Sequence, residues 1–178
     1  MLKILGLIAA VVVIAVAVFA VYAATKPDSF TVRRAIAIKA PPEKIFALIT
    51  DLHGWAAWSP YEAKDPAMKR TFSGAPSGKG AIYEWDGNSK VGQGRMEITD
   101  TAPAAKVVIK LDFIRPFEGH NTAEFTLAPQ GDATAVTWSM YGPARYVTKV
   151  MGTVFDLDRM IGSDFEVGLA NLKAAAEK

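Results

Sequence analysis

The sequence predicts an α+β fold in which a curved antiparallel sheet packs around a long C-terminal helix, behind a single transmembrane helix. Three patterns support this prediction. Residues 4–24 form an uncharged apolar run, residues 69–141 hold about six short segments of alternating apolar and polar side chains, and the period becomes helical from Val147 to Leu172. A curved sheet needs an apolar cover on its inner face, and only the last helix is long enough to supply it.

The first of these patterns, residues 4–24, has the length of a membrane span. Twenty-one residues at helical rise reach about 31 Å, close to the roughly 30 Å hydrocarbon core of a bilayer. Tyr22, near the end of the run, suits the headgroup level. A cleaved signal peptide is the alternative, although the apolar part of a signal peptide usually spans only about 7–15 residues. We expect an uncleaved anchor that crosses a bacterial inner membrane once, with the side of the folded domain left open.

The chain divides into three parts. Residues 1–25 are the expected anchor with its short N-terminal flank, residues 26–29 are a linker in which Pro27 discourages helix continuation, and residues 30–178 form one domain. Without residues 1–24, which contain Lys3 as their one charged residue, 19 basic and 18 acidic side chains remain. This balance, with no basic cluster, argues against a nucleic-acid partner. The absence of cysteine excludes disulfides and thiol chemistry.

The first elements of the domain are a strand and two short helices. Residues 30–40 alternate as a half-buried strand does. Pro41-Pro42-Glu43 begins a helix that reaches residue 49, because proline is tolerated in the first turn and Glu43 suits its positive end. Residues 51–58 form a second short helical piece, which Ser59-Pro60 ends.

Six strands follow, and their short connections imply an antiparallel meander. They are predicted at residues 69–73, 81–85, 95–100, 107–113, 123–127 and 136–140. The C-terminal stripe then extends over about thirty residues and is interrupted by Gly152, Gly162 and Gly168, each of which costs roughly 1 kcal/mol in a helix interior. Ser163–Glu166 matches a capping box, so a break near Gly162 and a close approach of the glycines to the sheet are equal alternatives.

Several local motifs accompany this order of elements. They are Ala40–Phe46 after the first strand, Thr50-Asp51 with Trp55 and Trp58–Pro60, Tyr83–Trp85 before Gly87-Asn88, and Phe165-Glu166 with Leu169 and Leu172. With them, residues 30–178 resemble the SRPBCC superfamily (the START/birch-pollen-allergen helix-grip fold), in its polyketide cyclase/dehydrase-like branch. The resemblance implies a helix-grip fold with an apolar cavity between sheet and C-terminal helix for lipids, polyketides, sterols or similar molecules. It implies no single catalytic motif.

Ten side chains are candidates to line such a cavity. Most are aromatic or methionine side chains, which pack cores as readily as they contact a guest, so core packing alone is the alternative for each. The candidates are Trp58, Tyr83, Trp85, Met96, Phe113, Asn121, Phe125, Trp138, Met140 and Phe155.

No catalytic residue, cofactor or metal site is predicted. His120 with Glu118 and Asn121 is the best acid–base group, but alternation places His120 on the face opposite the core while Asn121 points inward. His53 is expected to be exposed or capping. Residues 74–80 (GAPSGKG) lack the spacing and the hydroxyl residue of a phosphate loop. Two histidines without cysteine argue against zinc, and no serine lies in a nucleophile elbow.

The expected function is therefore a membrane-anchored, non-enzymatic binding module for a hydrophobic small molecule such as a lipid, an isoprenoid or a polyketide-like compound. Two alternatives remain. One is a cyclase/dehydrase-type enzyme in which Asn121, Tyr83 or Tyr141 orients an enolisable substrate. The other is a membrane-associated protein-interaction module with an exposed apolar patch.

Overall fold

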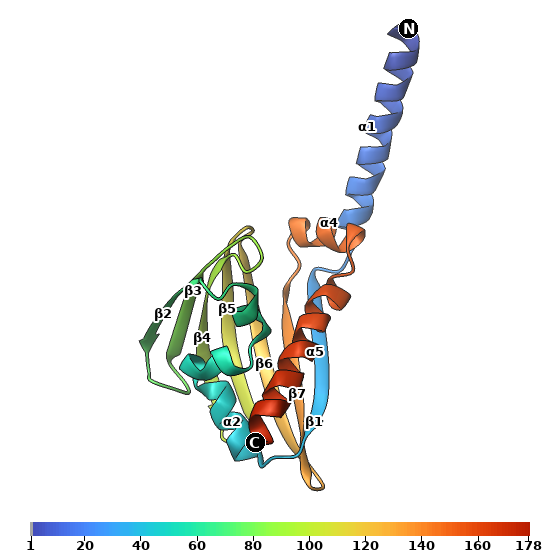
Figure 1. The fold of residues 1–178 in the computed structure, drawn as a ribbon. Coiled ribbons are helices and arrows are strands. Elements are labelled where there is room, and N and C mark those ends of the chain that lie inside the picture. The colour runs from blue at the N-terminus through green and yellow to red at the C-terminus, as the bar shows by residue number, and fades with distance from the viewer. Residues whose placement is uncertain (1) are drawn as a thin grey trace.

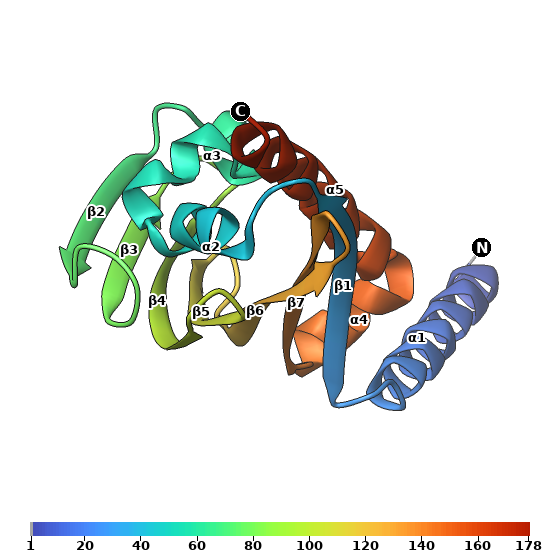
Figure 2. The same ribbon diagram turned by 90° about the horizontal axis from the view of Figure 1, so that it is seen from below.

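A seven-stranded antiparallel sheet curves around helices, and one long helix projects away from it (Figures 1 and 2). The computed structural model describes residues 2–178. The projecting helix is α1 (Leu2–Ala24), and the sheet has the order β1-β7-β6-β5-β4-β3-β2. The predicted α+β, helix-grip architecture is confirmed.

Every neighbouring pair of strands is antiparallel, so β2 to β7 form the predicted meander and β1 pairs with β7. The strands are β1 (Ser29–Ile38), β2 (Lys69–Gly74), β3 (Ala81–Asp86), β4 (Gln93–Ala102), β5 (Lys106–Arg115), β6 (Gly119–Gln130) and β7 (Ala133–Pro143).

Two α-helices and a 3₁₀ helix between β1 and β2 cover one part of the inner face. They are α2 (Pro42–Thr50), η1 (Leu52–Ala57) and α3 (Pro60–Lys64). The indole nitrogen of Trp55 donates to the carbonyl oxygen of Ile49 at 2.9 Å, and that of Trp58 donates to Leu48 at 3.2 Å. These two tryptophans therefore fasten η1 to α2, and their hydrogen bonds offset the cost of burying two polar N–H groups.

The C-terminal stripe forms two helices, α4 (Tyr146–Val154) and α5 (Leu157–Ala176). The break lies at Phe155-Asp156, where the side chain of Asp156 accepts a hydrogen bond from the backbone N–H of Arg159 at 2.9 Å. The predicted alternative of a break near Gly162 is wrong, because Gly162 lies inside α5 and is buried there.

The other alternative, in which the glycines let the helix approach the sheet closely, agrees with the structure at Gly162 and Gly168. A Cβ atom on Gly168 would lie 2.7 Å from the ring of Trp138, and one on Gly162 would overlap the guanidinium of Arg34. Arg34, on β1, also pairs with Asp158 at 2.9 Å and with Glu166 at 2.7 Å. Glycine in α5 thus lets the helix lie close against β1 and β7.

Most of the fully buried aliphatic side chains lie towards the end of the sheet far from α1. The register places Ile38 of β1 beside Thr134 of β7 at that end, and Ser29 beside Pro143 at the end next to α1. In Figure 1, α2 and the C-terminal end of α5 lie at the far end, whereas α4 lies between α1 and the start of α5. The side chains that fill the far half are fully buried and include Ile38, Ile45, Ile49, Ile98, Val107, Phe125, Val136 and Leu172.

Candidate ligand-binding cavity

A cavity of about 670 Å³ lies in the half of the domain next to α1, between the inner face of the sheet and helices α3, α4 and α5. Its position follows from the packing, since α2 fills the far half and no comparable helix fills the near half. The volume lies within the range of about 300–1,000 Å³ typical of small-molecule sites. Its walls are mainly apolar and include Met68, Met96, Ile109, Leu111, Met140, Met151 and Phe165.

Seven of the ten predicted lining residues border this cavity. They are Tyr83, Trp85, Met96, Phe113, Asn121, Trp138 and Met140. They come from β3, β4, β5, β6 and β7, so the inward face of the curved sheet brings together side chains that are distant in sequence. Binding of a guest by these residues stays a prediction.

The other three predicted residues lie elsewhere. Phe125 faces inward but belongs to the packed far half, where it is fully buried. Trp58 packs edge-on against Phe125 and Trp138, at ring distances of 6.0 and 5.8 Å, and does not border the cavity. Phe155 is 54% exposed at the junction of α4 and α5.

Glu62 and Tyr83, which both border the cavity, form a polar cluster with Arg70 behind them. The hydroxyl of Tyr83 donates to Glu62 Oε1 at 2.6 Å, and Arg70 Nε donates to Glu62 Oε2 at 2.7 Å. Burial raises the pKa of Tyr83, and the hydrogen bond to Glu62 raises it further, so the phenol keeps its proton at neutral pH. The phenol that borders the cavity therefore already donates its hydroxyl hydrogen to a buried carboxylate.

A second polar group lies on the α3 and α5 side. Lys64 Nζ pairs with Asp164 Oδ2 at 2.5 Å, and both residues border the cavity. Tyr61 is half-buried and also borders the cavity. Burial, followed by the charge of Asp164, raises the pKa of Tyr61. Like Tyr83, it stays protonated.

Trp138 carries an unused hydrogen-bond donor. It is 3% exposed, and its ring stacks on Phe165 at 4.1 Å between ring centroids. Within residues 2–178, its Nε1 is the one fully buried side-chain nitrogen or oxygen with no protein partner. Because Trp138 borders the cavity, an oxygen atom of a guest is a suitable acceptor for this N–H.

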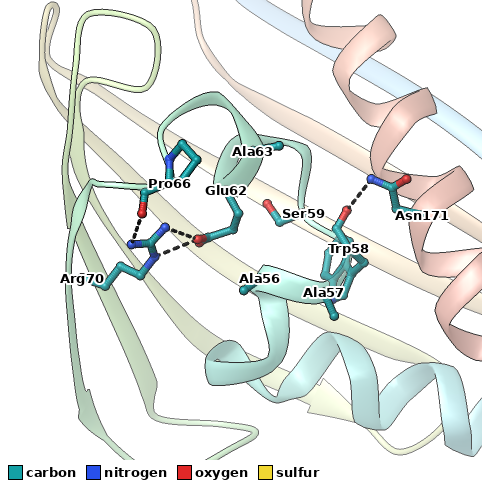
Figure 3. A pocket seen from close by; sticks show the side chains of 9 residues that line it. All are labelled: Ala56, Ala57, Trp58, Ser59, Glu62, Ala63, Pro66, Arg70 and Asn171. Carbon is teal, nitrogen blue, oxygen red and sulfur yellow. Dashed lines mark hydrogen bonds and ion pairs between the residues drawn. The ribbon is translucent and has the colours of Figure 1, made fainter.

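A second, outer pocket of about 300 Å³ lies behind this wall, and Figure 3 shows its residues. Glu62 and Ser59 border both spaces. The polar groups of the outer pocket are already paired, since Arg70 binds Glu62 and Asn171 Nδ2 donates to the carbonyl oxygen of Trp58 at 3.2 Å. Alanines form much of the remaining wall, so the inner cavity is the stronger candidate for a guest.

The histidines lie outside the cavity. His120 is exposed on the outer face of the sheet, where its Nδ1 lies 2.7 Å from Asp112 Oδ1, and Asn121 borders the cavity as alternation predicted. His53 is exposed and its ring stacks on Phe72. Tyr141, named in the enzyme alternative, is exposed and does not line the cavity. Over the part of the chain that the structure describes, no three His, Asp or Glu side chains form a group able to hold a metal ion.

Sequence reasoning missed Glu62, Tyr61, Lys64 and Asp164. The sequence predicts that the second helical piece ends at Ser59-Pro60 and so misses α3, which carries Glu62. It also gives no sign of the partners of Glu62, because Arg70 and Tyr83 lie on β2 and β3. The signal that was available is Ser59-Pro60 itself, which can begin a helix as well as end one, since proline is favoured at the first helical position.

Comparison with known proteins gives a family match over most of the chain. A family model described as polyketide cyclase / dehydrase and lipid transport matches residues 29–177. No curated protein matches the sequence.

Solved structures share the fold at low identity. Protein CV1439 from Chromobacterium violaceum has a TM-score of 0.59 at 15% identity, covering 86% of this chain and 99% of its own. The Aha1 dimer from Colwellia psychrerythraea has a TM-score of 0.57 at 20% identity, covering 83% and 96%. The di-domain ARO/CYC StfQ from the steffimycin biosynthetic pathway has a TM-score of 0.60 at 12% identity, covering 84% and 51%. At such identities the likeness concerns the fold.

Proposed function

Because the chain belongs to the polyketide cyclase/dehydrase and lipid transport family, we propose that it is a membrane-anchored carrier of one hydrophobic small molecule, held in the cavity between sheet and α5. The observation that carries the proposal is the cavity of about 670 Å³ with mainly apolar walls. Its few polar groups suit a guest that is apolar over most of its length and carries an oxygen atom. A lipid, an isoprenoid or a polyketide-like compound meets that description.

Anchoring by α1 is part of the proposal. The helix from Lys3 to Ala24 is long and apolar enough to cross a membrane, a property that a signal sequence shares. The helix projects away from the domain (Figure 1), and among residues 3–24 only Ala23 is buried. The expected result is a membrane-fraction protein whose intact mass includes residues 1–24. A soluble form that begins after Ala24 contradicts the anchor.

Guest binding is tested by purifying the full chain in mild detergent and measuring copurified molecules by native mass spectrometry. Leu111 borders the cavity from β5, so Leu111→Trp fills part of the space and is expected to remove most of the bound guest. The matched control is Thr126→Trp, which adds the same ring on the outer face of β6, where Thr126 is exposed. A wild-type chain without guest, or equal occupancy in both variants, contradicts the carrier function.

The enzyme alternative has one specific observation in its favour, the hydrogen bond between Tyr83 and Glu62 at the cavity wall. A protonated phenol backed by a carboxylate is able to act as a general acid. A cyclase/dehydrase step at this pair releases water. If Tyr83→Phe blocks that step, the molecule that copurifies with the variant is the unreacted substrate, which is heavier by one water than the molecule that copurifies with the wild type. A carrier predicts the same guest mass from both chains.

A further inference from the structure

The cavity and α1 lie at the same end of the domain. The register places the ends of β1, β5, β6 and β7 that carry Ser29, Arg115, Gly119 and Pro143 on the α1 side of the sheet. Residues at this end also border the cavity, among them Phe30, Lys90, Phe117, Gly119, Pro143 and Arg145. The space inside the domain therefore reaches the end from which the expected anchor emerges.

Large apolar side chains are exposed around this end. Phe117, in the turn between β5 and β6, is 53% exposed, as is Met160 at the start of α5, and both also border the cavity. Burying aromatic and aliphatic surface of this kind from water is favourable. We define the apolar rim as six large apolar side chains that are exposed at this end, namely Ile114, Phe117, Tyr146, Val154, Phe155 and Met160.

Helix α4 joins the apolar rim to α1. The Tyr146 hydroxyl donates to the carbonyl oxygen of Ala20 at 3.2 Å, and Lys149 Nζ pairs with Asp28 at 2.6 Å. Ala20 lies four residues before the end of α1, which is about 6 Å along the helix axis. If α1 crosses a bilayer, α4 therefore lies at the level of its headgroups, where tyrosine and lysine are favourable.

Helix α4 is also the roof of the cavity. Val147, Thr148 and Met151 border the space, yet none of the nine residues of α4 is buried. In Figure 1, α4 lies across the top of the domain between α1 and α5. Its inner side faces the cavity while its other sides remain uncovered by the domain.

We propose that the apolar rim is a membrane-docking surface, which rests on the bilayer that holds α1 and opens the cavity towards the lipid phase. The inference rests on the proposed function for the role of α1, and it adds the surface through which the guest passes. A bilayer is the partner that fits, because the apolar rim is continuous with a helix whose exposed residues 4–22 are almost all apolar. Rim contact removes the need for an apolar guest to cross water.

Single-cysteine labelling tests the docking directly, since the chain has no cysteine of its own. Phe155→Cys and Phe117→Cys, in the full chain, receive an environment-sensitive fluorophore and are reconstituted into vesicles of phosphatidylcholine and phosphatidylglycerol. The matched control is Val167→Cys on α5, which is 53% exposed and outside the apolar rim. The two rim labels are expected to shift to the blue and to lose emission when nitroxide-labelled lipids are included, while the label at residue 167 does neither.

Equal, water-like emission at all three positions overturns the docking surface. If the rim labels instead quench one another between copies, with no effect of nitroxide lipids, the apolar rim binds a second copy and the inference is wrong. These outcomes do not depend on guest occupancy. If the rim labels contact the membrane but no guest copurifies with the chain, the carrier function is refuted and the docking surface is still supported.

Discussion

At the residue scale, Glu62 is a carboxylate held inside the domain by two named partners. Its side chain is 8% exposed, and it accepts hydrogen bonds from Tyr83 at 2.6 Å and Arg70 at 2.7 Å. A buried carboxylate is costly unless such partners satisfy it. Tyr83 therefore stabilises the wall of the cavity as well as bordering it.

Tyr83→Phe removes one hydrogen bond from Glu62 and leaves that oxygen atom short of a partner. We expect a loss of about 1.5–3 kcal/mol in the free energy of unfolding, as for hydrogen bonds to charged groups. Chemical denaturation of the full chain in detergent measures it. The control is Tyr141→Phe, at an exposed position, with an expected change under about 0.5 kcal/mol. Equal losses in the two variants contradict the role of the buried pair.

His120 makes the stability of the outer face depend on pH. The hydrogen bond to Asp112 raises the pKa of His120 above its ordinary value of 6.5. Burial acts to raise the pKa of Asp112, but hydrogen bonds from His120 and Lys110 outweigh it and lower that pKa. The folded state thus favours the charged imidazole. Its stabilisation is complete below pH 6.5, while Asp112 is ionised, and is lost as the pH rises through the raised pKa.

His120→Gln tests this linkage. The wild type is expected to exceed the variant in free energy of unfolding at about pH 5.5, and the difference is expected to shrink at about pH 8.5. Urea denaturation at the two pH values gives the comparison. A difference that stays the same, or grows with pH, would show that the ion pair does not favour the charged form.

Alternation along the strands predicts which residues face inward, but not how far along the sheet the cavity extends. Tyr83, Met96 and Trp138 face inward and border the cavity for that reason. Phe125 faces inward too, yet packing from α2 fills its half of the sheet. That packing is a tertiary contact between distant segments, which no local pattern reports. Phe155 was misplaced because the expected single helical stripe continued through it.

At the element scale, the break between α4 and α5 separates a helix that covers the cavity from a helix that packs against the sheet. Helix α5 is tied to β1 by Arg34, by Lys173 Nζ donating to Ala37 at 2.9 Å, and by Glu177 accepting from the backbone N–H of Lys39 at 2.7 Å. The side chain of Lys149 pairs with Asp28, outside the sheet. The period of apolar residues predicted the combined length well, because α5 buries its apolar stripe and α4 turns Val147 and Met151 towards the cavity. The position of the break depends on the Asp156 cap.

Substitution by alanine is expected to change the stability in opposite directions at Gly168 in α5 and at Gly152 in α4. At Gly168 a Cβ atom would lie 2.7 Å from Trp138 and 2.9 Å from Pro60, so Gly168→Ala is expected to cost about 1–3 kcal/mol through overpacking. At Gly152 the nearest atom, on Leu157, lies 3.4 Å away, so Gly152→Ala is expected to stabilise by up to about 1 kcal/mol. Thermal unfolding of both variants decides it. Stabilisation by both would mean that α5 does not need the close approach.

At the scale of the whole molecule, the domain has a packed half and a hollow half, and α1 emerges from the hollow one. The sequence predicted the length of α1, the order of the strands and the antiparallel meander, since local composition and period determine each of them. It did not predict that β1 and α4 would bring α1 and the cavity to one end of the domain. That arrangement follows from the register of β1 with β7.

A chain that begins at Thr25 tests the predicted division into anchor and domain. Among residues 3–24 only Ala23 is buried, so α1 contributes little to the core. We expect the shortened chain to unfold cooperatively, with a midpoint within about 5 °C of the full chain. Circular dichroism on heating measures the transition. A shortened chain without a cooperative transition would show that α1 belongs to the folded domain.

The most direct measurement of the central claim is photo-crosslinking of the full chain, in vesicles, with an apolar diazirine probe, followed by peptide mapping. A guest cavity beside the anchor predicts saturable adducts on inward residues such as Met96, Leu111 and Met140, which an excess of the extracted guest prevents. Adducts confined to α1 and to exposed side chains, unaffected by the guest, would contradict it.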